Sequence, residues 1–414
     1  MDNQIYIPIL KSKEGELNAL RALADNISSR IIPLIEIVSD ERLLTRHAKV
    51  DITSKISAFI SEKDHKYKYE YNEKKKRLSI KGRMTNKEQS QLLGLNGEND
   101  YQSTIIALFN ESNPTVAEYL DYVLDSILDV MGEKRIMYLD PYYLGIANPS
   151  INVYAMLIEK MMKRNLNAVL VMRIDALEKN LGVPTSTPLT ELAIRIKPNE
   201  LASLSRVTEF ICGKLSLALS KIDLILDYDN LLESDDLQKY SIDYDLLINQ
   251  NEWRKIIFSG ASFPVDLTAF HAHGEYEIPR LEWRLWKAFI ERHMDSKNVF
   301  YSDYTIRSPA LPPSGMVNAS ATIRYACADF WFVLRGKSVR HDKKKYKQFH
   351  DLSENMIHDD KYAGEGHCFG DQFISDCANK LIGPGNLSNW VTVGEVHHIT
   401  TVVEQLSNYP EILK

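Results

Sequence analysis

The sequence predicts an α/β protein built around a (β/α)8 barrel of the TIM type. Short apolar runs rich in β-branched and aromatic residues recur along the chain, longer amphipathic stretches separate them, and eight such runs are found. Connections long enough to hold a helix indicate parallel strands, because an antiparallel neighbour needs only a hairpin. An open doubly wound sheet is the alternative, since the pattern does not reveal whether the sheet closes.

Each predicted element follows from its own pattern of apolar residues. The strands are expected at residues 6–10, 31–38, 135–139, 168–174, 223–226, 255–259, 299–302 and 322–334. The helices are expected at residues 14–26, 115–131, 154–164, 200–219, 237–250 and 281–293. This order assigns residues 1–338 to the barrel and residues 339–414 to a C-terminal appendage packed on it.

Composition limits the classes of function. The 414 residues are 44% hydrophobic and 26% charged, which is typical of a globular protein with a sizeable core. A net charge of −6 provides no broad basic surface for nucleic acid. The N-terminus has no signal-peptide pattern and no long apolar run occurs, so we expect a cytoplasmic protein without a membrane contact. The four cysteines form no CxxC pair and are expected to be reduced thiols.

A tyrosine- and lysine-rich insertion interrupts the barrel pattern at residues 62–100, after the second strand. Lysines alternating with tyrosines over residues 65–81 favour a solvated β-ribbon whose charges protect an edge. The same composition also suits single-stranded nucleic acid, which stacks on aromatic rings and pairs its phosphates with lysines. Nucleic acid is therefore the less favoured partner.

Charged residues follow the predicted strands at the end where TIM barrels carry their sites. Carboxylates there are candidates for general-base catalysis or for a divalent cation as cofactor, with Glu36 and Asp140 the strongest because they lie in apolar strands. Cations and tyrosines beside them suit an anionic small molecule. A salt-bridged network without a catalytic task is the alternative. The candidate catalytic residues are Glu36, Asp140, Asp227 and Asp303, and the candidate ligand-binding residues are Lys11, Lys13, Tyr142, Arg173, Tyr304 and Arg324.

Histidine, cysteine and aspartate recur in the C-terminal region, at His367, Cys368 and Asp371 and again at His397 and His398. These residue types ligate zinc or form Cys–His pairs. The intervals match no familiar zinc pattern, and adjacent histidines on an extended segment point to opposite faces. We therefore expect structural or capping roles for them.

Several passages together resemble the beta family, named after a phage-encoded beta protein. They are residues 6–16 (YIPILKSKEGE), 32–36 (IPLIE), 138–140 (YLD), 226–228 (LDY), 370–371 (GD) and 390–398 (WVTVGEVHH), so the resemblance spans nearly the whole chain. The tyrosine- and lysine-rich insertion departs from the family pattern.

Proteins of this family are encoded by phages, satellite phages and bacterial mobile elements, beside a toxic partner in a locus that excludes other phages. The resemblance implies a component of a phage-defence or phage-exclusion module and supplies no reaction. Together with the charged strand ends, the resemblance leads us to expect that the barrel mouth binds a phosphorylated small molecule or nucleotide. The hypothesis extends to hydrolysis of that ligand. The alternative is a non-catalytic protein that recognises or neutralises a toxin or phage protein from the same locus.

Overall fold

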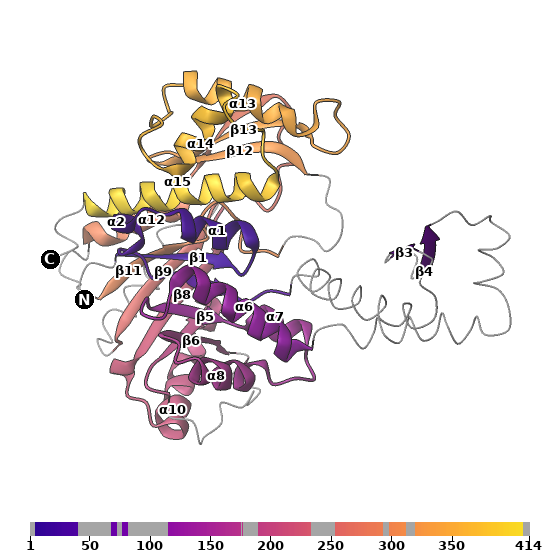
Figure 1. The fold of residues 1–414 in the computed structure, drawn as a ribbon. Coiled ribbons are helices and arrows are strands. Elements are labelled where there is room, and N and C mark those ends of the chain that lie inside the picture. The colour runs from indigo at the N-terminus through magenta and orange to yellow at the C-terminus, as the bar shows by residue number, and fades with distance from the viewer. Residues whose placement is uncertain are drawn as a thin grey trace, which may run out of the picture. The chain divides into compact units, whose positions relative to one another are not determined.

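The computed structural model describes residues 5–39, 68–72, 77–81, 115–174, 176, 189–232, 253–292, 298–311 and 319–408. The chain forms two compact units, residues 39–122 and the remainder. The larger unit holds a parallel barrel and the C-terminal region, whose elements are labelled in Figure 1.

Eight parallel strands close into a barrel in the order β1-β11-β9-β8-β7-β6-β5-β2. Closure is complete because β1 pairs with β11 on one side and with β2 on the other. This confirms the predicted (β/α)8 fold and excludes the open sheet. The strands are β1 (Tyr6–Lys11), β2 (Leu34–Glu36), β5 (Met137–Asp140), β6 (Ala168–Arg173), β7 (Leu192–Ile196), β8 (Ile222–Asn230), β9 (Lys255–Ala261) and β11 (Val299–Asp303).

One predicted barrel strand was wrong, and one real strand was missed. Residues 322–334 do not enter the barrel; they form parts of β12 (Ser320–Ala326) and β13 (Phe330–Ser338), which pair antiparallel in a separate sheet with β10 (Gly274–Pro279). A tight turn separates them, in which the Cys327 amide donates to the Phe330 carbonyl at 2.9 Å. The missing barrel strand is β7, so the barrel ends at β11 and not near residue 338.

The described helices up to residue 292 follow the predicted amphipathic stretches, except for α7, which was not predicted. They are α1 (Glu14–Ala22) with α2 (Asp25–Ser28), α6 (Val116–Met131), α7 (Tyr142–Ala147), α8 (Val153–Lys163), α10 (Leu204–Leu215) and α12 (Leu281–Arg292). The first prediction divides in two because Leu23 is extended and ends α1. The helix predicted at residues 237–250 lies outside the described residues. Among the described helices, none has the length and apolar character needed to cross a membrane.

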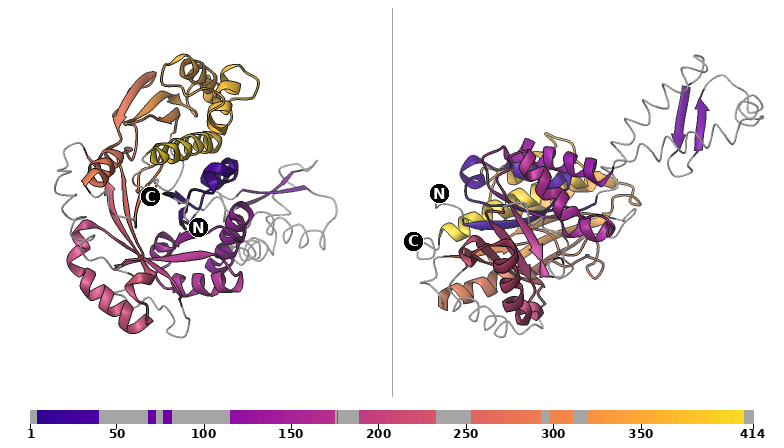
Figure 2. Two further views of the ribbon diagram at one scale, coloured as in Figure 1. Left: turned by 90° about the vertical axis from the view of Figure 1, so that its left-hand side faces the viewer. Right: turned by 90° about the horizontal axis from the view of Figure 1, so that it is seen from below.

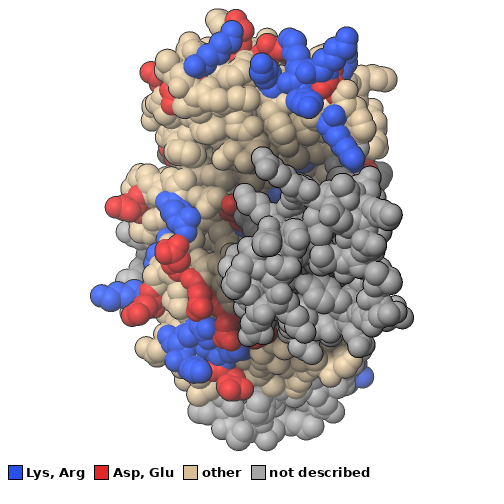
Figure 3. All heavy atoms as spheres, turned by 45° about the vertical axis from the view of Figure 1, so that its right-hand side comes forward, with Lys and Arg blue, Asp and Glu red and all other residues tan. Residues whose placement is uncertain are grey.

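The C-terminal region packs three helices, α13 (Gln348–His358), α14 (Phe369–Ala378) and α15 (Leu387–Ser407), with the antiparallel sheet. Helix α15 also packs against α1 and β1 of the barrel, and it lies beside α1 in both views of Figure 2. Gly15 permits this approach, since a Cβ there would lie 3.0 Å from the Ser388 carbonyl oxygen. In Figure 3 lysine and arginine side chains gather on this region, which contains the exposed residues Arg340, Lys343, Lys344, Lys345 and Lys347.

In the smaller unit, β3 (Lys68–Asn72) pairs antiparallel with β4 (Arg77–Lys81). This confirms a β-ribbon within the tyrosine- and lysine-rich insertion. The connection between these strands, and the rest of the insertion up to residue 100, lie outside the described residues.

Candidate functional site

The barrel register brings charged residues from distant parts of the chain into one layer. Alternate residues of a strand share a face, so Lys11 follows the buried Ile7 and Ile9 toward the interior. Lys11 pairs in register with Glu36, and Glu36 with Asp140. Arg173 pairs with Arg195 on the neighbouring strands β6 and β7. The layer lies at the carboxyl end of the strands, where TIM barrels carry their sites.

Arg195 is the centre of this layer, and only 2% of the residue is exposed. Its Nη1 donates to Glu36 Oε1 at 2.9 Å and to Asp140 Oδ2 at 2.8 Å. Its Nε donates to Asp227 Oδ2 at 2.9 Å, and its Nη2 donates to the Tyr304 hydroxyl. Tyr304 in turn donates to Asp227 Oδ2 at 2.6 Å. One buried guanidinium therefore holds three buried carboxylates.

Arg173 is the more solvent-accessible cation of the layer, with 13% of its side chain exposed. Its Nη2 donates to Asp140 Oδ2 at 3.0 Å and lies 3.4 Å from Glu36 Oε1. The guanidinium lies 4.0 Å from the centre of the Tyr142 ring and 5.1 Å from that of Tyr143. Among the described residues, none accepts a hydrogen bond from its Nη1. Within the described part of the chain, that nitrogen is a donor of the layer that a ligand could use.

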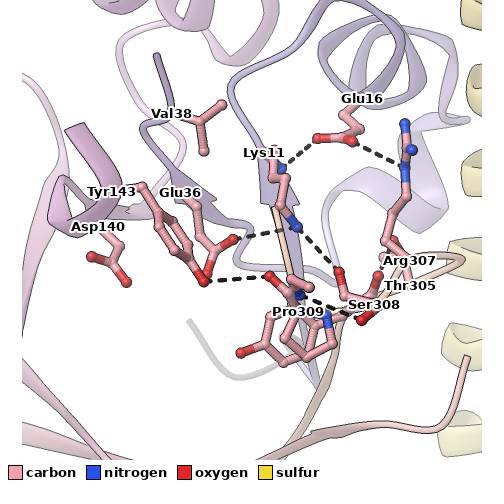
Figure 4. Close-up of polar contacts among 12 residues, drawn as sticks. Lys11, Glu16, Glu36, Val38, Asp140, Tyr143, Thr305, Arg307, Ser308 and Pro309 are labelled. Atoms are coloured by element: carbon pink, nitrogen blue, oxygen red, sulfur yellow. Dashed lines mark hydrogen bonds and ion pairs between the residues drawn. The ribbon is translucent and has the colours of Figure 1, made fainter. Parts of the chain in front are cut away.

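Lys11 completes the layer on the β1 side. Its Nζ lies 3.6 Å from Glu36 Oε2 and donates to the Ser308 carbonyl at 3.3 Å. Figure 4 shows Lys11 between these two groups, with the Tyr143 hydroxyl donating to the Pro309 carbonyl nearby. The segment that follows β11 thus lies against the layer and supplies both carbonyl acceptors.

The electrostatics favour fixed charges over proton transfer. Burial alone would raise the pKa of the Asp227 carboxyl, but Arg195 and the Tyr304 hydroxyl outweigh it, and the pKa lies below its ordinary value. Burial raises the pKa of Tyr304 well above its ordinary value. Burial and the nearby Glu36 raise the pKa of Tyr143 to about 12. A general base needs a carboxylate that exchanges a proton near neutral pH, and Asp227 is held ionised.

The charges of the layer balance, with Lys11, Arg173 and Arg195 facing Glu36, Asp140 and Asp227. The Arg195 guanidinium occupies the position between the carboxylates that a shared divalent cation would need. The arrangement therefore does not favour the divalent cofactor considered from the sequence. It leaves the face of Arg173 as the part of the layer suited to an anion.

Asp303 lies in a different cluster from the other predicted carboxylates. It accepts hydrogen bonds from the Tyr6 hydroxyl and, at 2.9 Å, from the Tyr301 hydroxyl, and it lies 2.9 Å from His398 Nε2 on α15. Burial opposes ionisation, but His398 and Tyr6 lower the pKa of Asp303 to about 2. Tyr6 is adjacent to the inward-facing Ile7 on β1, so its side chain faces the outside of the barrel. Asp303, which contacts Tyr6, therefore also faces outward and joins the barrel to α15. It does not belong to the mouth.

Two predicted ligand-binding cations also lie apart from the layer. Lys13 precedes α1, two residues beyond the end of β1. Arg324 lies on β12, where its Nη1 donates to the Ile306 carbonyl at 2.9 Å and its guanidinium lies 4.7 Å from the centre of the Phe263 ring. Desolvation and the nearby Arg307 lower the pKa of Arg324 to about 9. Its prediction as a mouth residue rested on the strand wrongly placed at residues 322–334.

The central residue, Arg195, was missed from the sequence because its strand was missed. The run Leu192-Ala193-Ile194-Arg195-Ile196 is short, but its buried apolar residues on both sides of an arginine are the signal of a barrel strand with a charged inward residue. Tyr143 was passed over although it adjoins the predicted Tyr142. The remaining predicted residues, Lys11, Glu36, Asp140, Tyr142, Arg173, Asp227 and Tyr304, do come together.

The C-terminal histidines, cysteine and aspartate meet, although their spacing argued against a shared site. Donor atoms of His367, Cys368, Asp371 and His397 all lie within 4.8 Å of one another. The segment carrying His397 and His398 is the helix α15 and not the extended strand expected. The two histidines still diverge, since His398 contacts Asp303 instead.

A closed barrel with a charge-balanced layer at its strand ends defines this chain as a TIM-barrel protein with a polar mouth. The family model described as Beta protein matches residues 6–71 and 95–404. The chain therefore belongs to the beta protein family, as the resemblance of its motifs indicated. No curated protein and no solved structure gives a significant match.

Proposed function

We propose that the barrel mouth binds an anionic small molecule carrying a phosphate or carboxylate group, and that the protein acts in a phage-defence or phage-exclusion module. The observation that carries the first part is Arg173. Its guanidinium is oriented by Asp140 and Tyr142, and its Nη1 donates to none of the described residues. A preoriented guanidinium is the group best suited to an oxyanion.

Binding is favoured over hydrolysis by the state of the carboxylates. Glu36, Asp140 and Asp227 each form ion pairs with arginine, and Arg195 holds Asp227 ionised. None of the three is left as a free base. The role in phage defence rests on family membership and on the resemblance of the motifs, and a ligand-binding barrel suits a sensor in such a module.

The test is thermal unfolding of the full chain against a panel of nucleotides, sugar phosphates and dicarboxylates. A ligand at one hundred times its Kd stabilises the native state by about 2.7 kcal/mol. For a chain of 414 residues that raises Tm by roughly 3 °C. Arg173→Gln should reduce the shift at the same ligand concentration by about half or more, because loss of a charge-assisted hydrogen bond costs about 1.5 to 3 kcal/mol of binding free energy.

Arg254→Gln is the matched control. Arg254 pairs with the buried Asp223 at the opposite end of the same barrel, with Nε donating to Asp223 Oδ1 at 2.7 Å. Its loss should lower Tm and leave the ligand-induced shift intact. If no compound shifts Tm, or if both variants keep the shift, the proposed site is wrong. A stable complex with the product of the neighbouring gene would then favour recognition of a protein partner.

A further inference from the structure

Four potential metal ligands converge in the C-terminal region, outside the barrel mouth. His367 and Cys368 precede α14, Asp371 lies in its first turn, and His397 projects from α15. One donor atom from each lies within 4.8 Å of all the others. Two of these side chains are buried and two are half-buried, so the cluster is not a chance gathering of surface charges.

Asp371 and His397 each direct one polar atom into the cluster, and the second polar atom of each side chain contacts a residue outside the cluster. Asp371 Oδ2 accepts from Cys368 Sγ at 3.0 Å and lies 2.9 Å from His397 Nδ1. The other oxygen, Oδ1, accepts from the Tyr325 hydroxyl at 2.6 Å. His397 Nε2 lies 2.9 Å from the Ala326 carbonyl oxygen, to which it donates. A backbone carbonyl behind a histidine and a hydroxyl behind a carboxylate are the usual outer partners of metal ligands.

His367 fits the same arrangement. Its Nδ1 lies 3.7 Å from Glu404 Oε2, and its Nε2 is buried without a hydrogen-bond partner among the described residues. The His367 and His397 rings lie 5.4 Å apart between their centres. A buried ring nitrogen without a partner is costly unless something occupies the space before it.

We propose that His367, Cys368, Asp371 and His397 bind one zinc ion in a closed, four-coordinate structural site. A thiolate, two imidazoles and a carboxylate are a donor set that suits zinc. Tetrahedral zinc places its ligand atoms about 3.3 to 3.8 Å apart, given bond lengths of about 2.0 to 2.3 Å. The separations of 2.9 and 3.0 Å around Asp371 and the limit of 4.8 Å bracket that range, so small side-chain movements complete the geometry.

A nucleophilic cysteine is the competing interpretation, and the contacts oppose it. The Cys368 thiol faces the Asp371 carboxylate and not a histidine. A catalytic thiol needs a neighbouring histidine or cation to stabilise its thiolate, whereas the partner here is an anion. Coordination to zinc would instead remove the thiol proton.

Proton balance follows from the contacts. His397 Nε2 faces a backbone carbonyl, which can only accept, so Nδ1 is the nitrogen that is left to bind zinc. Zinc would displace the proton of the Cys368 thiol and any proton held between His397 Nδ1 and Asp371 Oδ2, and these protons would leave to solvent. No oxidation or reduction is involved.

The site would fix the helix that joins the C-terminal region to the barrel. A Cβ on Gly370 would lie 2.4 Å from the Val393 carbonyl oxygen, so α14 approaches α15 at the closest distance its backbone allows. Zinc would clamp this contact through His397, and the next residue, His398, contacts Asp303 at the end of β11. The proposed metal thus stabilises the docking of α15 on the barrel.

The experiment is metal analysis of the purified full chain, followed by replacement of the metal with Co²⁺. We expect one zinc per chain, and a cobalt–thiolate charge-transfer band on substitution. Cys368→Ser should lack the cobalt–thiolate band, and its affinity for zinc should fall at least tenfold. Cys327→Ser is the matched control, a half-buried cysteine of the same region outside the cluster, and should keep both.

Because loss of a buried ligand can unfold this region, Cys368→His serves as a second variant that keeps a zinc donor. It should retain zinc and lack the thiolate band. Wild-type protein that contains no zinc and, after treatment with chelator, takes up neither Zn²⁺ nor Co²⁺ would overturn the proposal. A cobalt–thiolate band that persists in Cys368→Ser would also overturn it.

Discussion

Replacing Arg195 with methionine tests whether the barrel mouth depends on one buried cation. The substitution keeps much of the side-chain volume and removes the charge that Glu36, Asp140 and Asp227 share. Glu36 and Asp140 would still contact Arg173. Asp227 would lose the one cation that lies within ion-pair distance of it among the described residues.

The magnitude follows from leaving that one carboxylate unpaired. Only 2% of Asp227 is exposed, and its remaining partners would be the Tyr304 hydroxyl and the Asp229 amide. Removing one partner of a buried ion pair costs about 3 to 5 kcal/mol. We expect Arg195→Met to lose that much free energy of unfolding at pH 7. Adding Asp227→Asn should recover about half of the loss, since the amide carries no charge.

The pH dependence has a definite sign. In the wild-type protein the pKa of Asp227 is lowered, so its contribution is present at neutral pH and is lost as the pH falls below the unfolded value. In Arg195→Met, burial without the arginine raises that pKa, and acid relieves the buried charge. The deficit of the variant should therefore shrink between pH 7 and pH 5.

Urea denaturation at both pH values measures these effects. Arg254→Met is the matched control, because 18% of that side chain is exposed and its partner Asp223 keeps the Tyr138 hydroxyl. Arg254→Met should lose less free energy of unfolding than Arg195→Met. A loss below about 1 kcal/mol for Arg195→Met at pH 7, or no recovery with Asp227→Asn, would refute the reasoning.

Buried carboxyls and a close helix contact outside the mouth give three more predictions. Burial and the neighbouring Glu16 raise the pKa of Glu395 to about 8, so wild-type stability should fall relative to Glu395→Gln as the pH rises from 5 to 9, measured by urea unfolding. Asp303→Asn should lose about 2 kcal/mol of free energy of unfolding at pH 7, because the pKa of Asp303 is lowered to about 2, largely by His398. If the difference in stability between the variant and the wild-type protein does not narrow toward pH 3, this explanation is wrong. Gly15→Val should lose about 1 to 3 kcal/mol by thermal unfolding, because its Cβ would press on α15; unchanged stability would show that the helices can separate freely.

The fold was predictable because strand and helix periods differ clearly in most of the chain. The exception is β7, which was missed while residues 322–334 were predicted as a barrel strand. Strand β7 has five residues, whereas residues 322–334 form a longer apolar run. Length therefore favoured the wrong segment as a barrel strand. Whether a strand enters a barrel or an antiparallel sheet depends on pairing partners, which a local pattern does not contain.

The candidate site was predictable where a charge ends an apolar strand, as for Glu36 and Asp140. The position of Asp303 was not, because a shift of one residue along a strand moves a side chain to the opposite face. The cluster around Asp371 was also beyond reach, since His397 meets it only through the packing of α14 on α15. Spacing along the chain cannot reveal a contact that tertiary packing creates.

The central claim is that the barrel mouth holds an anion on Arg173. A crystal soaked in tungstate, a heavy analogue of phosphate, tests it by anomalous scattering. The account predicts a tungstate peak within hydrogen-bond distance of Arg173 Nη1, beside the Tyr142 ring, and its absence in crystals of Arg173→Gln. Peaks confined to the basic surface around Arg340 and Lys344, with only water at the mouth, would contradict it.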